Sequence, residues 1–291
     1  EMVPGLQALD AVIDGSVEMS HGAAYYWQNK SPALSFFTGV PYGMTSRELA
    51  AWVRYLGGQE QWDKIYDQFG VKGYLSGDTG TQAGGWFKNE LTGVSDLQGL
   101  RFRTPGLGGQ VWGKLGASVT NMAAGDIFAA LQSGTLDAAE FVGPYNDLAL
   151  GFYQVAKNYY FPSFVEPGLA TELVVSKSKL AELPEDLQEL VAVCAQASYD
   201  DVASDMYANY PRALRSLVDE HGVQIRRFPD EILEAGAKAS MEVIADLRDS
   251  GDALTKETAE SFISAFNLLR ERTEGTDAPF LAAREKYIKY T

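Results

Sequence analysis

The stretch from residue 71 to residue 142 constrains the fold most, because strand patterns and helical patterns alternate along it. We expect the order strand, glycine-rich loop, strand, helix, strand, helix, strand, with one strand over Leu100–Thr104 and one helix around Gln110–Leu115. Strands that alternate with helices favour a mostly parallel sheet with helices on its faces. The sequence therefore predicts an α/β fold.

The segment DIFAALQSGTLDAAEFVG shows this alternation most clearly. Ile127 and Leu131 recur at helical spacing, and Gly134 ends the run. From Leu136 to Glu140 the apolar residues then alternate at the period of a strand. Ligands of open α/β sheets bind at the carboxyl ends of strands, so a strand that ends on a carboxylate makes Glu140 a candidate functional residue.

The other segments predict further helices and strands on both sides of this stretch. Helices are expected over Leu6–Ile13, over residues 46–70 with a break at Gly57-Gly58, through Leu148, Phe152 and Val155, over residues 184–222 with a bend near Pro211, and in two or three segments at the end. Strands are expected over residues 17–19, 32–39, 170–178 and 223–229.

A repeated local pattern indicates two similar lobes. AVIDGSVEMS near the start and ALQSGTLDAAE in the middle are each typical of a helix, a glycine and a short strand. No Pro/Ser-rich linker separates two halves of the chain. Two lobes would therefore be joined through ordered strands or helices, as at a hinge.

The charge of the chain restricts the partners that it can bind. The net charge is −15 and the pI is about 4.6. Nucleic acids and anionic membrane surfaces require a basic face, so we expect neither as a partner. A small anionic ligand remains compatible with this charge, because a single local arginine can bind it.

Few residues suit redox, metal or nucleophilic chemistry. Cys194 is the only cysteine, which excludes a disulfide within this sequence, and its apolar neighbours predict that it packs in the core. His21 and His221 lie far apart without metal-ligand spacing, so we expect structural or surface roles for both. No apolar run approaches the roughly 18 residues that a membrane-spanning helix needs.

Three polar residues are expected at strand ends or in the loop beside them: Gln82, Arg103 and Glu140. The planar guanidinium of Arg103 fits both oxygens of a carboxylate. Glu140 would repel such an anion unless a cation lay between them. Because Na⁺ and Ca²⁺ accept carboxylate, amide and carbonyl oxygens, Glu140, Gln82 and the backbone carbonyl of Phe141 form a consistent ligand set.

Simpler roles for the same residues are also compatible with the sequence. Glu140 can be a solvated acid at a strand end, and Arg103 can pair with a structural acid such as Asp126. Gln82 can be an ordinary loop residue. The spacing of the three residues does not by itself bring them together.

Several motifs, taken together, resemble one protein family. They are DLQGLRFRTPG, IFAALQSGTLDAAEFVGPYND, GFYQVAKNYYFPSFVEPG and ELVVSKSKLAELP, and the likeness extends from EMVPGLQALD to the final helices. The chain resembles the DctP-type solute-binding subunit of tripartite ATP-independent periplasmic (TRAP) transporters, in the branch that binds α-keto acids. The resemblance implies a two-lobed periplasmic binding protein with a hinge, a ligand cleft and long C-terminal helices.

The resemblance also implies roles for single residues. Arg103 matches the family's carboxylate-binding arginine. Gln82, Glu140 and the carbonyl of Phe141 match the positions that hold a metal ion, Na⁺ or Ca²⁺, which bridges the ligand. Phe141 stands where the branch commonly has tryptophan, and Val165 stands where relatives often have a more polar residue. Both differences imply a pocket of altered shape.

Four further residues are expected to contact the ligand. Tyr26 and Trp27 lie in SHGAAYYWQNK, which matches a segment that lines the cleft, and Tyr25 beside them is another candidate. Because side chains alternate along an extended segment, at least one of these three is expected to pack in the core. Asn146 and Glu166 complete the expected ligand-binding set.

The implied function is the capture of a small 2-oxo or 2-hydroxy monocarboxylate in the periplasm and its delivery to TRAP membrane subunits. Lobe I is expected to comprise residues 1–79 and 171–208, and lobe II residues 80–170 and 209–291. Pairing of C-terminal helices between two copies would give a homodimer, and packing of the helix across its own lobes is the alternative. Relatives begin with a further strand and helix before EMVPG, so the chain is expected to start inside lobe I.

Two other functions are compatible with a cation near an arginine. A metal-dependent lyase or decarboxylase acting on 2-oxo acids would use the cation as a Lewis acid. The motifs offer no His, Cys or Lys in a suggestive position for it, so we expect a protein that is not an enzyme. A receptor for an aromatic or other carboxylate is the remaining alternative.

Overall fold

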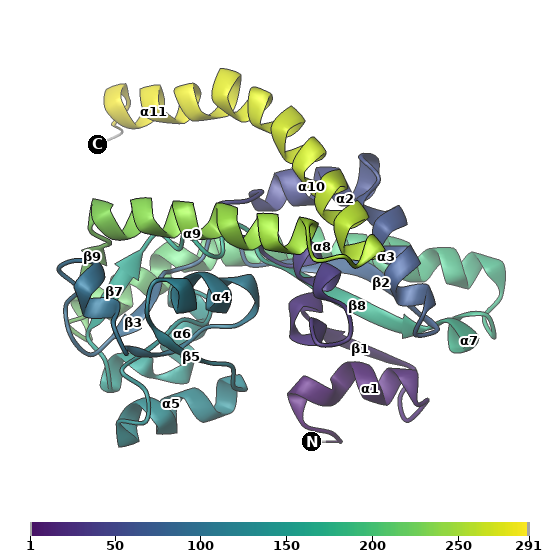
Figure 1. Cartoon of the computed structure of the whole chain (residues 1–291), viewed down its shortest axis with the longest axis horizontal. Helices are drawn as coiled ribbons and strands as arrows, with labels where there is room; N and C mark the ends of the chain where they lie inside the picture. The colour runs from purple at the N-terminus through teal and green to yellow at the C-terminus, as the bar shows by residue number, and fades with distance from the viewer. Residues whose placement is uncertain (1, 290–291) are drawn as a thin grey trace.

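Two separate β-sheets organise the chain in the computed structural model, which describes residues 2–289 (Figure 1). The first sheet has the order β1-β8-β2, from β1 (Met19–Gly22), β8 (Ala170–Ser176) and β2 (Val71–Asp78), and both pairings are antiparallel. Helices α1 (Ala8–Ile13), α2 (Ser46–Tyr55), α3 (Gly58–Asp67) and α7 (Lys177–Leu180) lie in the same part of the molecule. We call this part lobe I.

The second sheet has six strands in the order β5-β4-β6-β3-β7-β9. They are β5 (Ser118–Thr120), β4 (Arg101–Arg103), β6 (Ala138–Ala139), β3 (Gly85–Phe87), β7 (Asn158–Phe161) and β9 (Gln224–Arg227). Strand β4 is parallel to β5 and β6, whereas β3 is antiparallel to β6 and β7. Together with α4 (Gly106–Lys114), α5 (Ala124–Ser133), α6 (Pro144–Leu150) and α9 (Asp230–Arg248) it forms lobe II.

The prediction of an α/β fold is confirmed, and the prediction of a mostly parallel sheet holds only in the second sheet, where three of the five pairings between described strands are parallel. The strand expected from residue 71 pairs antiparallel with β8 in lobe I, away from the strands that follow it in sequence. Strand β3 enters the second sheet antiparallel to both of its neighbours. A strand pattern defines the period of an element but does not define its partner, so the sequence could not separate the two sheets.

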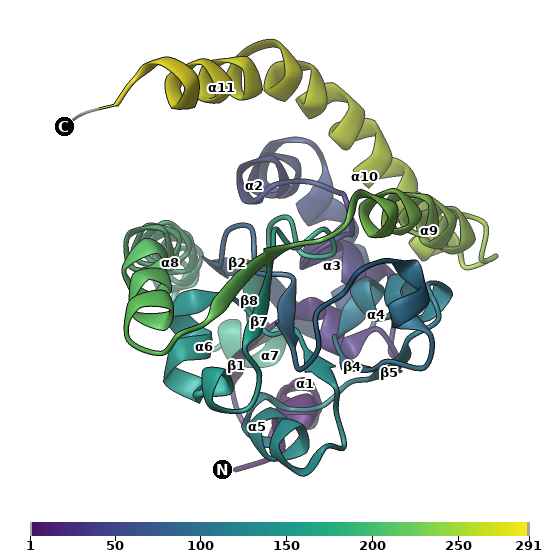
Figure 2. The same ribbon diagram turned by 90° about the vertical axis from the view of Figure 1, so that its left-hand side faces the viewer.

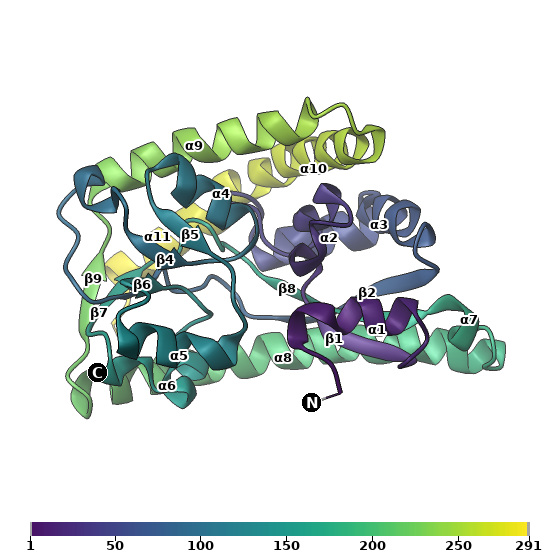
Figure 3. The same cartoon turned by 60° about the horizontal axis from the view of Figure 1, so that its bottom comes forward.

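Several elements join the two lobes. The chain leaves β2 and reaches β3 through residues 79–84, and it returns from β7 to β8 through residues 162–169. Helix α8 (Glu185–Asp219) contacts β2 in lobe I and α6 in lobe II, and it runs along both lobes (Figure 3). Helix α9 packs on α4, whereas α10 (Ala253–Arg272) packs on α2 and α3. These ordered crossings are compatible with a hinge, and the residue limits of the two lobes stay a prediction.

Aromatic side chains dominate the cores of both lobes. In lobe I, Phe37 stacks between Trp52 and Trp62, at centroid distances of 5.1 and 4.8 Å. In lobe II, Trp86 stacks on Tyr159 at 3.8 Å. All five side chains are almost completely buried. Burial of such large rings contributes strongly to stability, because each removes a large apolar area from water.

Glycine and proline account for where several helices end. Gly57 has a φ of 88° and separates α2 from α3, as the sequence predicted. Gly151 has a φ of 74° and ends α6, so the predicted helix is interrupted there; Phe152–Gln154 form a separate 3₁₀ helix, and Val155 lies outside it. Left-handed backbone is readily adopted by glycine, which is why helices commonly end there.

Three local predictions are corrected by the structure. The apolar run Pro32–Phe37 forms a 3₁₀ helix and not a strand, and it begins with proline, which favours the first turn of a helix. Ala24–Trp27 is likewise a 3₁₀ helix, so side chains do not alternate there as in a strand. Cys194 is exposed on α8 and does not pack in the core, because the buried face of α8 at this level is formed by Ala195 and Tyr199.

The last helix, α11 (Ala278–Tyr287), stands away from both lobes (Figure 1). Helix α10 leads through the π-helical turn Thr273–Asp277 into α11, which extends away from the rest of the molecule (Figure 2). None of the residues of α11 is buried. Phe280 and Leu281 are exposed on this helix. Among the described residues, no helix combines the length and the apolar character that crossing a membrane requires.

Candidate functional site

Arg103 and Glu140 lie side by side because they follow two neighbouring parallel strands. Arg103 ends β4, Glu140 follows β6, and the backbone N–H of Glu140 donates to the carbonyl of Arg103 at 2.9 Å. Each residue is only 1% exposed. The predicted proximity of the two side chains is thus present at the carboxyl ends of the strands.

The Arg103 guanidinium is fixed by two backbone carbonyls. Its Nε and one terminal nitrogen donate to the carbonyl of Met122 at 3.2 and 3.1 Å, and the other terminal nitrogen donates to the carbonyl of Glu140 at 2.6 Å. A guanidinium has five N–H groups. Among the described residues these contacts use three of them, which leaves two for a further acceptor. Asp126, the alternative partner that the sequence suggested, is exposed.

The Glu140 carboxylate is close to Arg103 without a direct hydrogen bond. The nearest oxygen lies 3.9 Å from the guanidinium, and the same oxygen accepts from the Thr104 hydroxyl at 3.3 Å. Burial raises the pKa of Glu140 to about 8, although the positive charge of Arg103 opposes this rise. A buried carboxyl with so little compensation favours either a proton or a nearby cation.

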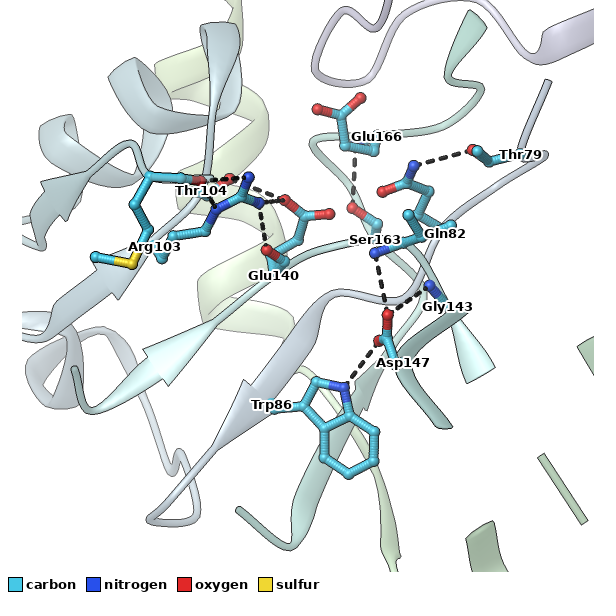
Figure 4. A network of polar contacts seen from close by, with 12 residues as sticks. Thr79, Gln82, Trp86, Arg103, Thr104, Glu140, Gly143, Asp147, Ser163 and Glu166 are labelled. Atoms are coloured by element: carbon cyan, nitrogen blue, oxygen red, sulfur yellow. Dashed lines mark hydrogen bonds and ion pairs between the residues drawn. The ribbon is translucent and has the colours of Figure 1, made fainter. Parts of the chain in front are cut away.

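Gln82, on the segment that joins the lobes, lies beside Glu140 (Figure 4). One end of its amide lies 2.7 Å from the free Glu140 oxygen and 3.0 Å from the Phe141 carbonyl oxygen, and the other end lies 2.9 Å from the Thr79 hydroxyl. Gln82 is 1% exposed. The side chain therefore has one end inside the site and one end on Thr79.

The three predicted cation ligands thus converge. With its oxygen turned inward, the Gln82 amide, the Glu140 carboxylate and the Phe141 carbonyl place three oxygens together with no hydrogen between them. Such a set is repulsive by itself and suits a hard cation such as Na⁺ or Ca²⁺. It holds one carboxylate, and no group of three or more His, Cys, Asp or Glu suited to a metal occurs in residues 2–289. The residues present fit the predicted ion.

A second buried acid supports the turn that carries the Phe141 carbonyl. Asp147 accepts from the backbone N–H groups of Val142 and Gly143 at 3.3 Å each, and from Trp86 at 2.8 Å and Tyr159 at 2.6 Å. Burial raises its pKa to about 6. Sequence reasoning missed this residue. The signal was present in GPYND, because an acid in the first turn of a helix commonly accepts from preceding backbone N–H groups.

Glu166 approaches the same site from the β7–β8 connection. It is 2% exposed, one carboxylate oxygen has no hydrogen-bond partner among the described residues, and burial and the nearby Glu140 raise its pKa well above the usual range. A Cβ on Gly39 would lie 2.0 Å from that oxygen. Glu166 therefore touches the backbone of lobe I, and its predicted role as a ligand contact stays a prediction.

The expectation that at least one residue of the aromatic triplet packs in the core is confirmed, because Tyr25 and Trp27 are both buried. Trp27 is buried and donates its indole N–H to Glu172 at 2.7 Å, inside lobe I. Tyr26 is half-buried and stacks on Tyr25 at 4.6 Å. Tyr25 is the residue that reaches across, since a Cβ on Gly106 at the start of α4 would lie 2.6 Å from its ring. Contact of Tyr26 and Trp27 with a ligand stays a prediction.

Asn146, the last predicted ligand contact, lies on α6. Its side-chain oxygen is buried and has no hydrogen-bond partner among residues 2–289. An unpaired buried amide oxygen is uncommon in a folded protein and is compatible with a further polar partner at this place. The contact itself stays a prediction.

Comparisons with known proteins give a consistent result. The family model for bacterial extracellular solute-binding protein, family 7 (DctP), matches residues 1–249. The monocarboxylate 2-oxoacid-binding periplasmic protein of Nostoc sp. (strain PCC 7120) is 40% identical over 262 residues, which cover 90% of this chain and 71% of that protein.

Solved structures of TRAP solute-binding proteins are similar along nearly the whole chain. One from Pseudoalteromonas atlantica, with bound sodium and pyruvate, has a TM-score of 0.92 and 35% identity, covering 98% of this chain and 85% of that one. One from Bordetella bronchiseptica, a mixed-occupancy dimer with calcium and picolinate bound in one site, has a TM-score of 0.94 and 32% identity, covering 99% and 86%.

Proposed function

The chain belongs to the DctP family of bacterial extracellular solute-binding proteins, and from this premise we propose that it captures a small 2-oxo monocarboxylate together with Na⁺ or Ca²⁺. Members of this family are extracytoplasmic receptors of TRAP transporters and not enzymes. The lyase or decarboxylase that the sequence left open is therefore not proposed.

The arrangement of opposite charges at one buried place carries this proposal. Arg103 has two N–H groups left for an anion. Three oxygens, from Gln82, Glu140 and Phe141, lie together where a cation can bind. A carboxylate would bind Arg103 by a charge-assisted pair of hydrogen bonds. A bound cation would supply positive charge between Glu140 and the ligand. A 2-oxo acid presents both a carboxylate and a further oxygen, so it suits both halves of the site.

Residues from both lobes enclose this place, which suggests how capture occurs. Tyr25 from lobe I packs against the start of α4 in lobe II, and Gly39 of lobe I touches Glu166. Tyr42 of lobe I donates its hydroxyl to the carbonyl of Leu233 on α9 at 2.8 Å. A ligand that contacts both lobes would stabilise the closed form over an open form.

The shape of the ligand is less restricted than its charge. Phe141 lies 5.7 Å from the Arg103 guanidinium, so its ring is close to the anion-binding group. Picolinate in the Bordetella protein is an aromatic acid that carries a carboxylate next to a second donor atom. A receptor for such an aromatic carboxylate is the second function that we consider, and it uses the same two halves of the site.

Membrane partners follow from the family, because its members deliver their solute to TRAP membrane subunits.

We further propose that α11 packs on a second copy of this chain. Phe280 and Leu281 are exposed on it, and the described chain covers neither. Replacing both by serine should convert a dimer to a monomer in size-exclusion chromatography with light scattering. The exposed Tyr55 replaced by serine is the control, and a monomeric unmodified protein would contradict the proposal.

Titration of pyruvate into cation-depleted protein, with and without added Na⁺ or Ca²⁺, tests the main proposal. We expect pyruvate to bind tightly only with one of the cations, because the oxygens of the site otherwise repel the carboxylate. Glu140→Gln should remove the cation dependence, whereas Asp126→Asn, an exposed acid on α5, should not. If neither pyruvate nor picolinate binds at any cation concentration, the proposal is refuted.

A further inference from the structure

Gln82 can present either end of its amide to the site, and the two ends have opposite effects. With the nitrogen inward, it would donate to the Glu140 carboxylate at 2.7 Å and to the Phe141 carbonyl at 3.0 Å. With the oxygen inward, it adds a third acceptor to these two. The first arrangement fills the place of a cation with hydrogen bonds, and the second arrangement creates a cation site.

Within residues 2–289, the outer end of the amide has one partner, the hydroxyl of Thr79 at 2.9 Å. A hydroxyl can both donate and accept. When it donates its hydrogen to the carbonyl of Gly80, at 3.2 Å, it is free to accept from the Gln82 nitrogen. When the amide is reversed, the same hydroxyl instead donates to the Gln82 oxygen. The position of this one hydrogen is therefore coupled to which end of Gln82 faces inward.

The surroundings hold Thr79 and Gln82 in place. Asp78 is 2% exposed, and one of its oxygens accepts from the Gly80 N–H and from Ser46 at 2.6 Å each. Tyr199 donates to its other oxygen at 2.7 Å. The backbone N–H of Gln82 donates to the carbonyl of Glu166 at 3.1 Å. With the backbone fixed at both residues, the amide can change the site mainly by rotating end over end.

We propose that Thr79 is the positioning residue for the cation site: with its hydrogen held on the Gly80 carbonyl, its hydroxyl can only accept from the Gln82 amide nitrogen, which turns the amide oxygen toward Glu140 and Phe141. This inference rests on the proposed function, because it gives Thr79 a role only if a cation binds there. A cation polarises the amide that ligates it and makes the N–H groups better donors, so the contact with Thr79 is strongest in the cation-bound state.

Replacing Thr79 by valine removes the hydroxyl and nearly preserves the shape of the side chain. The buried Gln82 nitrogen then lacks an acceptor when the oxygen faces inward. Partners of this kind typically change metal affinity by 10–100-fold, so we expect Thr79→Val to weaken Ca²⁺ binding about tenfold or more. Thr79→Ser keeps the hydroxyl and should stay within about threefold of the unmodified protein.

A double variant separates orientation from general damage. In Gln82→Glu both ends of the side chain are oxygens, so the orientation that Thr79 controls no longer matters. Thr79→Val should therefore lose its weakening effect when it is combined with Gln82→Glu. A variant that merely loosens the segment would weaken cation binding in both backgrounds and would lower the cation-free melting temperature.

The measurement is calorimetric titration of Ca²⁺ at saturating pyruvate, together with NMR spectra of protein carrying ¹⁵N in its glutamine side chains. We expect Ca²⁺ to shift the Gln82 side-chain signals at a lower concentration in the unmodified protein and in Thr79→Ser than in Thr79→Val. If Thr79→Val binds Ca²⁺ like the unmodified protein, the inference is overturned and the proposed function stands. If the unmodified protein itself shows no cation effect, both are overturned.

Discussion

Replacing Arg103 by lysine tests the anion-binding half of the site while keeping its charge. The guanidinium uses three N–H groups on the carbonyls of Met122 and Glu140 and keeps two. A lysine ammonium has three N–H groups in all. Two of them are needed for the same two buried carbonyls, so only one remains for a carboxylate.

The expected loss follows from this count. One charge-assisted hydrogen bond is worth about 1.5–3 kcal/mol, which corresponds to roughly a 10- to 150-fold weaker affinity for pyruvate. Arg103→Ala goes further, because it also leaves the carbonyls of Met122 and Glu140 without their donor. At about 1–3 kcal/mol for each buried unpaired group, it should lower the free energy of unfolding as well as abolish binding.

Calorimetric titration of pyruvate at saturating cation, with thermal unfolding as a check of folding, measures both effects. Arg101→Lys is the matched control, since Arg101 lies two residues earlier on β4, has a 49% exposed side chain and pairs with Asp137. We expect its affinity to be unchanged. A folded Arg103→Lys protein that binds pyruvate within about threefold of the unmodified protein would show that Arg103 does not hold the carboxylate.

Three further predictions concern buried acids and a close contact. Burial raises the pKa of Glu172 to about 7 from 4.5, so its stabilising effect is complete below about pH 4.5 and is lost as the pH rises through 7. The substitution Glu172→Gln should therefore remove at most roughly 3 kcal/mol of the change in unfolding free energy between pH 5 and 8, as measured by urea unfolding at each pH. An unaltered pH profile would contradict this assignment. Gly39→Ala places a methyl group against Glu166, between the two lobes, and should weaken pyruvate binding as measured by calorimetry. Equal affinity would show that the Gly39–Glu166 contact is not needed in the closed form. Asp147→Asn places an amide N–H against the buried indole N–H of Trp86, so two donors face each other. The free energy of unfolding in urea should fall by about 1–3 kcal/mol. Undiminished stability would argue against this hydrogen-bond network.

The sequence predicted the elements of the fold better than their pairing. The break between α2 and α3 and the strand β8 follow from glycines and from apolar period, which are local signals. The sequence predicts a strand at Pro32–Phe37, where the structure has a 3₁₀ helix, because a nearly continuous apolar run has no period that distinguishes strand from helix. The antiparallel pairing of β2 with β8 joins residues about 100 positions apart, which no local pattern encodes.

The sequence could predict where the candidate site lies, but not which neighbouring side chains orient its residues. Arg103 and Glu140 end neighbouring parallel strands, and that register brings them together in any sheet of this order. Whether Trp27 faces the cleft could not be predicted, because its direction depends on Glu172, a buried acid from a strand 145 positions away. Burying an unpaired carboxylate costs free energy. The indole N–H of Trp27 and the hydroxyl of Tyr66 therefore both point into the core and donate to Glu172.

The same reasoning explains why the polar residues around the site matter as much as those inside it. Arg103, Glu140 and Glu166 are each at most 2% exposed, so two acids share one base without solvent. Such a group is stable only if a cation or a proton supplies the missing positive charge. The oxygens that would hold a cation come from the side-chain amide of Gln82 on one segment and from the carboxylate of Glu140 and the backbone carbonyl of the adjacent Phe141 on another. Thr79 fixes the first, Thr104 contacts the second, and Asp147 secures the turn of the third. Loss of the Thr79 or the Thr104 contact should therefore act on cation affinity before it acts on the fold, whereas loss of the Asp147 contacts should act on both.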